Sequence, residues 1–163
     1  MAVYTKVSES EATEFLRAYD IGELRELVGI KQGIQNTNYV LYTTKGRYIL
    51  TLYEPRNVRE EDLPFFLGLM EHLAGKGIAC PLPVRARDGA ALRRLAERPA
   101  AIVTFLTGMW PRRVAPAHCD ALGRALAEFH AAGADFASAM GGPRDVSEMN
   151  MPRRRLVAAP TRK

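Results

Sequence analysis

This sequence of 163 residues lacks most of the features that assign a function at once. No apolar run approaches the roughly 18 residues of a membrane span, and the polar, acidic N-terminus resembles neither a signal nor a transit peptide. Only two cysteines occur, Cys80 and Cys119, and they stand far apart in no metal-binding spacing. We therefore expect no membrane association and free, buried thiols in a reducing cytoplasm.

The chain also lacks a basic stripe of the kind that binds nucleic acid. Its formal net charge is +5, but residues 141–163 contribute +4 and residues 1–140 only +1. Residues 138–163 show no hydrophobic period and contain prolines, glycines and three consecutive arginines, so we expect a disordered tail. We expect no nucleic-acid partner. The alternative is a non-enzymatic module that binds RNA or an acidic protein through this tail, with an affinity that falls as salt rises.

What the sequence does contain is a strand-rich stretch, residues 29–54, around which the rest is organised. It reads GIKQGIQNTNYVLYTTKGRYILTLYE, with two turns separated by the aromatic and β-branched runs that favour strands. The first turn holds Gly33, which can adopt positive φ, followed by Asn36 and Asn38, whose amides donate hydrogen bonds. A glycine turn of this kind covers phosphates in nucleotide-binding lobes. The alternative is an ordinary hairpin, because G-x-G-x-x-G and Walker A motifs are both absent.

Capping signals, prolines and hydrophobic periods define the other elements. Ser8-x-x-Glu11 predicts the start of a first helix, and Asp20-x-x-Glu23 predicts one further helical turn. Asp88-Gly89 predicts the turn of a hairpin over residues 85–95. We expect helices over 9–19, 63–76 and 116–132, and strands over 27–33, 38–43, 47–53, part of 85–95, and 100–107. A five-stranded antiparallel sheet with one helix against it fits these elements.

Four segments, taken together and in order, resemble the N-terminal half of bacterial homoserine kinases of the aminoglycoside-phosphotransferase and choline-kinase-like fold. They are residues 29–54, DLPFFLGLMEHLAGKGIACPLPV (62–84), RPAAIVTFLTG (98–108) and PAHCDALGRALAEFHAAGADF (116–136). The resemblance covers about residues 2–136 and implies an α+β fold, in which a protein-kinase-like small lobe precedes the first helix of a large lobe. The implied boundaries are 1–108 for the small lobe, 109–137 for the linker and first large-lobe helix, and 138–163 for the tail.

The resemblance also implies a nucleotide site for ATP between the two lobes. It places Gly33, Asn36 and Asn38 in the nucleotide-covering loop. It places Thr104, Phe105 and Leu106 at the end of the fifth strand, where the interlobe linker offers backbone groups to adenine. For these three residues the alternative is a plain buried strand. The third strand carries Thr51 where kinases usually have a phosphate-pairing Lys or Arg, so neutralisation of the α- and β-phosphates stays unassigned.

The residues that carry the chemistry of such kinases are missing from this sequence. No H-x-D-x-x-x-x-N loop occurs, and no second Asp stands in the right order to hold Mg²⁺. We interpret His130 and Asp135 as structural, and Glu71 as part of a solvated helix face. We therefore expect no catalytic or metal residues here, with the Mg²⁺ ligands on a missing half. A truncated or frameshifted reading frame would explain both the inactive fragment and the unrelated tail.

The implied reaction is the ATP-dependent phosphorylation of L-homoserine to O-phospho-L-homoserine, a step of threonine biosynthesis. The acceptor pocket would lie in the missing half, so a choline, aminoglycoside or methylthioribose-like alcohol remains an alternative substrate. The helix over 116–132 places Leu122, Leu126 and Phe129 on one face. Without the rest of a large lobe this face would be an exposed apolar patch, so we expect self-association or poor solubility.

Overall fold

The structure is a computed structural model, and it describes residues 4–31, 35–55, 58–109 and 111–136. In chain order the elements are α1 (Glu9–Leu16), β1 (Leu24–Gly29), β2 (Thr37–Thr43), β3 (Arg47–Leu52), the short helix η1 (Glu60–Asp62), α2 (Leu63–Gly75), β4 (Arg93–Leu95), β5 (Arg98–Thr104) and α3 (Pro116–Gly133). Gly33 and the expected tail over 138–163 lie outside the described residues.

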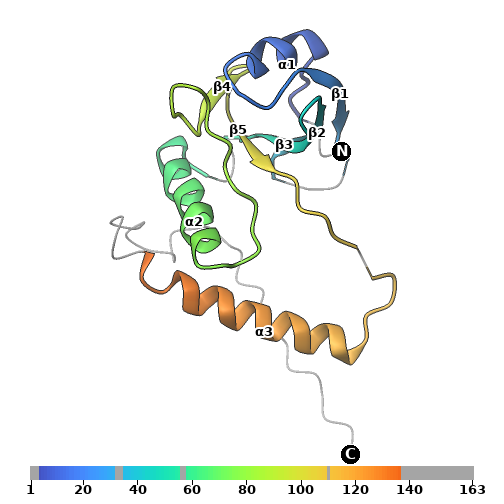
Figure 1. The fold of residues 1–163 in the computed structure, drawn as a ribbon, viewed down its shortest axis with the longest axis vertical. Coiled ribbons are helices and arrows are strands. Elements are labelled where there is room, and N and C mark those ends of the chain that lie inside the picture. The colour runs from blue at the N-terminus through green and yellow to red at the C-terminus, as the bar shows by residue number, and fades with distance from the viewer. Residues whose placement is uncertain (1–3, 32–34, 56–57, 110, 137–163) are drawn as a thin grey trace, which may run out of the picture.

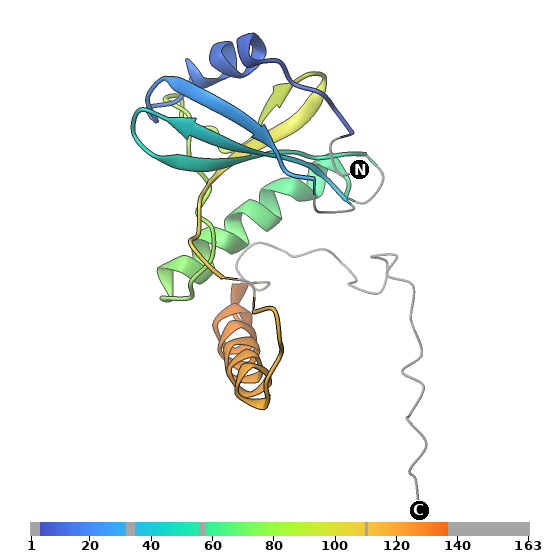
Figure 2. The ribbon, with the colours of Figure 1, turned by 90° about the vertical axis from the view of Figure 1, so that its right-hand side faces the viewer.

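The five strands form one antiparallel sheet in the order β1-β2-β3-β5-β4. Helix α1 packs on one side of this sheet and α2 lies on the other, with α3 beyond α2 (Figure 1, Figure 2). The α+β class and the five-stranded sheet are therefore confirmed. The expectation of one packed helix was incomplete, because α1 covers the second face.

A single apolar cluster holds α1 to the sheet. Alternate strand positions point toward α1, and the most buried of them have no exposed surface: Leu41 on β2, Leu50 and Leu52 on β3, and Ile102 on β5. Helix α1 contributes Ala12, Phe15 and Leu16 to the same cluster. The positions between these strand residues therefore face the opposite way, toward α2 and the open side of the sheet.

The start of α1 follows its sequence signal closely. The Ser8 side chain accepts a hydrogen bond from the Glu11 N–H at 3.3 Å, and the Glu11 carboxylate accepts one from the Ser8 N–H at 2.8 Å. The second signal failed, because residues 24–26 belong to β1 instead of a helical turn. Asp20 pairs with the Lys45 ammonium at 2.6 Å and caps nothing, while Gly22 adopts a φ of +84° that turns the chain into β1.

The second half of the sheet uses a different turn from the one expected. Asp88-Gly89 does form a tight turn, with Gly89 N–H donating to Ala86 O at 2.8 Å, but residues 85–87 form no strand. The hairpin instead joins β4 to β5 through Ala96 and Glu97, which have φ values of 48° and 60°. Neither residue is the Gly or Asn that usually marks such a turn, so nothing in the sequence signalled it.

Candidate functional site

An apolar row crosses the face of the sheet that points away from α1. Neighbouring strands align Val28 of β1 with Val40 of β2, Val40 with Ile49 of β3, and Ile49 with Val103 of β5. Val28 is 39% exposed, Val40 and Ile49 are half-buried, and Val103 is buried. The β1–β3 part of this row is thus an apolar surface that the described residues leave partly open.

Beside this row, toward the start of β2, two polar residues form a hydrogen-bonded pair. Thr51 of β3 lies opposite Asn38 of β2, and the Thr51 hydroxyl donates to Asn38 Oδ1 at 2.8 Å. The Asn38 Nδ2 makes a long hydrogen bond of 3.4 Å to the carbonyl of Asn36. Three of the predicted site residues therefore meet at this end of the hairpin. The orientation of the Asn38 amide leaves its nitrogen as the group with spare donor capacity.

The linker residues lie on the opposite side of the row from the polar pair. Thr104 pairs with Tyr48, three positions before Thr51 along β3, or about 10 Å along the strand. The Thr104 N–H donates to Leu82 O and the Leu82 N–H donates to Thr104 Oγ1, both at 2.9 Å, which fixes the end of β5. The apolar row thus lies between the polar pair and the linker.

Phe105 and Leu106 follow β5 and leave the sheet. The expected strand over 100–107 ends at Thr104, because the chain turns away there instead of continuing to pair. The Arg47 guanidinium lies over the Phe105 ring at 4.5 Å from its centre, and Leu106 is 48% exposed. Within the described part of the chain, the backbone groups of Phe105 and Leu106 make no hydrogen bond. They are free to bind a ligand.

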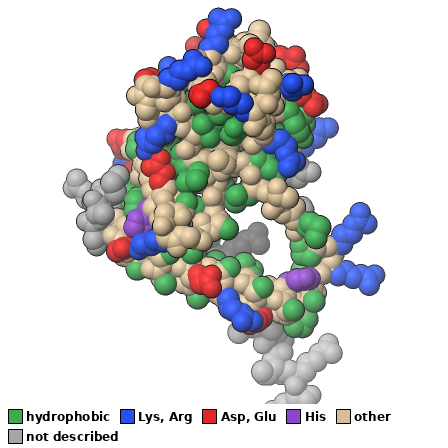
Figure 3. Space-filling view, viewed as in Figure 1, with side chains coloured by type: hydrophobic (Ala, Val, Ile, Leu, Met, Phe, Trp, Pro, Cys, Tyr) green, Lys and Arg blue, Asp and Glu red, His purple; other side chains and the backbone are tan. Residues whose placement is uncertain are grey.

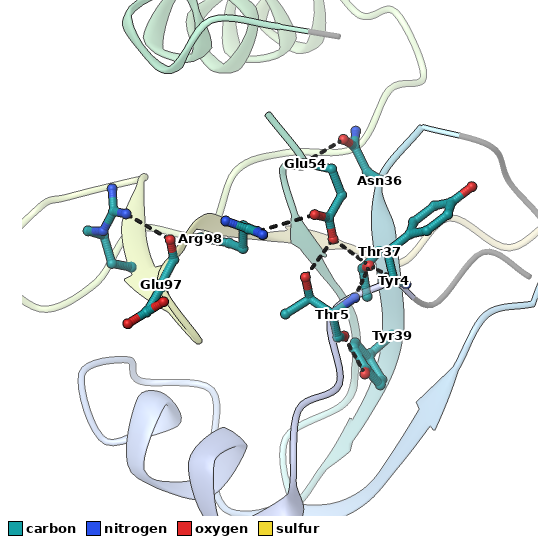
Figure 4. A network of polar contacts seen from close by, with 9 residues as sticks. Tyr4, Thr5, Asn36, Thr37, Tyr39, Glu54, Glu97 and Arg98 are labelled. Atoms are coloured by element: carbon teal, nitrogen blue, oxygen red, sulfur yellow. Dashed lines mark hydrogen bonds and ion pairs between the residues drawn. The ribbon is translucent and has the colours of Figure 1, made fainter. Parts of the chain in front are cut away.

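The Glu54 carboxylate lies among Thr5, Thr37 and Arg98, at the centre of a network of polar contacts (Figure 4). The Glu54 side chain is 10% exposed, and Glu54 Oε1 accepts hydrogen bonds from Thr5 Oγ1 at 2.7 Å and Thr37 Oγ1 at 2.8 Å. Arg98 Nε lies 3.2 Å from the other oxygen. Burial by itself raises the pKa of Glu54, but the two hydroxyl donors and the Arg98 charge outweigh it and hold the pKa below its ordinary value.

The same network ties the N-terminal segment to the sheet. Thr37 is fully buried, and its hydroxyl accepts from the N–H groups of Tyr4 at 2.9 Å and Thr5 at 3.0 Å. The Tyr39 hydroxyl donates to Thr5 O and accepts from Val7 N–H, each at 3.0 Å. Sequence reasoning missed Glu54, Thr5 and Thr37 as a group, because their partners are 17 to 49 residues apart in the chain.

The residues that mimic catalytic motifs have other roles. Asp135 accepts from Lys76 Nζ at 2.5 Å and from His72 Nε2 at 2.9 Å, which ties the end of α3 to α2. These two hydrogen bonds, that of Lys76 first, lower the pKa of Asp135. Glu71 forms an ion pair with Arg85 at 2.7 Å, and His130 is exposed on α3. Among the described residues no group of three His, Cys, Asp or Glu side chains could hold a metal ion.

Helix α3 presents one apolar stripe and one charged face. Leu122, Leu126 and Phe129 are 61%, 48% and 38% exposed, and hydrophobic side chains are visible along α3 in Figure 3. The opposite face carries an ion pair between Asp120 and Arg124. No helix in the described ranges is both long and apolar enough to span a membrane.

The two thiols are free, as expected, but only one is partly buried. Cys80 is half-buried and donates to Met70 O at 3.2 Å, whereas Cys119 is exposed on α3. The expectation that both are buried was wrong for Cys119, because the face of α3 that carries it packs against none of the described residues. A separate surface pocket on the α1 side of the sheet is lined by residues that include Arg17 and Arg87.

Comparison with known proteins gives a consistent result. The model of the phosphotransferase enzyme family matches residues 26–161. A homoserine kinase of Paramagnetospirillum magneticum is 60% identical over 136 residues, or 83% of this chain and 41% of its own length. A homoserine kinase of a Bradyrhizobium species is 56% identical over 147 residues, or 90% and 45%. This chain thus spans less than half the length of the curated relatives it matches.

Solved structures share the fold at low sequence identity. Spectinomycin phosphotransferase in complex with ADP and spectinomycin superposes with a TM-score of 0.60 at 14% identity, over 78% of this chain and 39% of its own. Amicoumacin kinase in complex with AMP-PNP, Ca²⁺ and Ami gives a TM-score of 0.60 at 16% identity, over 77% of this chain and 40% of its own. The family match runs past residue 137, so the boundary of an unrelated tail there stays a prediction.

Proposed function

We propose that this chain, which belongs to the phosphotransferase enzyme family, forms the nucleotide-covering part of a homoserine kinase. The observation that carries this proposal is the 56–60% identity to homoserine kinases over most of the chain. In the proposed reaction the hydroxyl oxygen of L-homoserine bonds to the γ-phosphorus of ATP. The bond from that phosphorus to the bridging oxygen of ADP breaks, and the hydroxyl proton passes to a base outside this chain.

The open face of the sheet supports this role geometrically. We place the adenine ring against Val40 and Ile49, with its polar edge at the free backbone groups of Phe105 and Leu106. The phosphates then extend toward Asn38, about 10 Å further along the sheet. Together with Gly33 and Asn36, the Asn38 amide would offer neutral donors where many kinases use a Lys. Such donors stabilise phosphate charge when they are already held in place.

Thr51 has a positioning role in this scheme. Its hydroxyl proton is directed at Asn38 Oδ1, which leaves Asn38 Nδ2 directed away from β3. Neutralisation of the phosphates would then rest on Mg²⁺, whose ligands we place outside this chain, as we do the proton acceptor. We therefore propose that the chain alone has no turnover, and that the enzyme works in the cytoplasm on ATP and a small amino-acid alcohol.

The exposed stripe of α3 supports one further part of the proposal. Leu122, Leu126 and Phe129 form a continuous apolar surface on a helix with no buried residue. In isolation the chain would bury this surface against a second copy. We propose weak self-association and no nucleic-acid partner.

A chimera tests the substrate. Residues 1–136 of this chain are joined to the C-terminal portion of the Paramagnetospirillum magneticum relative, and ADP release is measured with L-homoserine, choline and an aminoglycoside in turn. The proposal expects ADP release that depends on L-homoserine, and none from the unfused chain. Activity with another alcohol and none with L-homoserine would refute it, provided that the relative itself is active in the same assay.

A further inference from the structure

Glu54 is a charged side chain, only 10% exposed, that the proposed chemistry does not use. Removing a carboxylate from water is unfavourable unless hydrogen-bond donors replace the lost water. Here the donors come from three separate segments: Thr5 of the N-terminal segment, Thr37 at the start of β2, and Arg98 at the start of β5. An apolar side chain would fill this position without hydrogen-bond donors from three segments. We therefore look for a role of the Glu54 carboxylate beyond packing.

The network leads directly to the candidate nucleotide residues. The Glu54 N–H donates to Asn36 Oδ1 at 3.3 Å, and the Glu54 carboxylate accepts from Thr37, the residue after Asn36. Asn38 comes next and bonds to Thr51, three residues before Glu54. The exit of the turn is therefore held at Asn36, Thr37 and Asn38 in succession by residues at the end of β3 or just beyond it.

We infer that Glu54 is a positioning residue: with Thr5 and Thr37 it forms a clamp that holds Asn36 and Asn38 in the orientation for binding the nucleotide phosphates. This inference rests on the proposed function. The clamp works through charge as well as shape, because one carboxylate accepts from two hydroxyls and a guanidinium at once. Glu54 itself touches no substrate in this scheme.

A glutamine of the same shape cannot replace it. Its amide has one acceptor oxygen and one NH₂ donor. With the NH₂ toward Arg98, two donors face each other. With the NH₂ toward the hydroxyls, the Thr37 hydroxyl proton loses its acceptor. Thr37 Oγ1 already accepts from the N–H groups of Tyr4 and Thr5, so it has no room to accept from the new NH₂ as well. Either orientation removes at least one hydrogen bond from the network and so loosens the N-terminal segment or the turn.

Strand β2 offers a matched control at its other end. Thr43 is its last residue and Thr37 its first; both are buried, and both hydroxyls satisfy backbone groups. The Thr43 hydroxyl donates to Ile21 O at 2.6 Å. Thr43 lies at the opposite end of β2 from Asn36 and Asn38. Thr43→Val should therefore destabilise the fold as Thr37→Val does, without loosening Asn36 or Asn38.

The experiment measures amide hydrogen exchange at residues 35–40 and the affinity for AMP-PNP in the full chain. Glu54→Gln and Thr37→Val should speed exchange at residues 35–38 and weaken AMP-PNP binding, each by about tenfold. Thr43→Val should leave both within about twofold. Thr5→Val, which removes one hydrogen bond, supplies a milder variant if Glu54→Gln does not fold.

Two results would overturn the inference. One is unchanged exchange and affinity in Glu54→Gln or Thr5→Val. The other is an equal loss in Thr43→Val, which would make the clamp a stability element only. If the wild-type chain binds no AMP-PNP, the proposed function fails instead, and the exchange rates still decide whether Glu54 holds the turn.

Discussion

Gly22 offers a sharp test of how the first helix is joined to the sheet. Its φ is +84°, and a methyl group at this position would overlap Thr44 Oγ1 and lie 3.0 Å from the backbone nitrogen of Lys45. Thr44 cannot simply rotate away, because its hydroxyl accepts the Glu23 N–H at 3.0 Å. Gly22→Ala must therefore displace the turn between β2 and β3 or break that hydrogen bond.

Gly89 provides the matched control. Its φ is +85°, nearly the same as that of Gly22, but an added Cβ would meet nothing within 4 Å. Backbone strain costs about 1–2 kcal/mol, and the stiffer unfolded chain returns about 0.4–1 kcal/mol, so Gly89→Ala should cost about 1 kcal/mol or less. Gly22→Ala adds the lost hydrogen bond and the overpacking, for a total of about 3 kcal/mol.

Urea denaturation of the two variants measures this difference directly. At about 2–4 °C per kcal/mol, Gly22→Ala should also lower Tm by roughly 6–12 °C. Free energies of unfolding that agree within about 0.5 kcal/mol would refute the reasoning, since the two substitutions share their strain and differ only in what the methyl meets.

Three other predictions concern charge and surface. The pKa of Glu54 in the folded protein lies below its unfolded value of about 4.3. The carboxylate therefore stabilises the fold fully above that pH, and this contribution is lost as pH falls through the folded pKa. The difference in unfolding free energy between wild type and Glu54→Gln should be largest at pH 7 and shrink below about pH 4. Leu126→Asp should reduce self-association in sedimentation velocity, whereas Ala127→Asp, on the charged side of α3, should not, and equal effects would argue against the stripe. The buried hydroxyl of Tyr19 has no hydrogen-bond partner among the described residues, and burial raises its pKa to about 12, so Tyr19→Phe should stabilise by about 1 kcal/mol in urea titrations; a loss of stability would show that the hydroxyl is satisfied.

Local sequence signals correctly predicted the elements that depend mainly on interactions between residues close in the chain. The capping box at Ser8 begins α1, and the hydrophobic period of α3 places Leu122 and Leu126 on one face, as the structure shows. Where a local signal competed with a tertiary contact, the contact decided the outcome. Asp20 carries the sequence of a helix cap, yet its carboxylate pairs with Lys45 in the turn between β2 and β3.

The candidate site divides in the same way. Asn36, Asn38 and Thr51 were identified from a turn and a strand position, and strand register alone brings Asn38 and Thr51 together. Glu54 could not be found that way, because its hydroxyl donors come from the N-terminal segment and from β2, which only the folded chain brings together. Whether the identified residues bind nucleotide is still a prediction.

The most direct test is therefore to titrate AMP-PNP into the isotope-labelled chain and follow its amide signals. The account predicts shifts that concentrate along the open face of the sheet, at Val40, Ile49 and Thr51, and at Phe105 and Leu106 in the linker. Shifts confined to the pocket near Arg17 and Arg87, or no shifts at all, would contradict the claim that this face of the sheet carries the nucleotide.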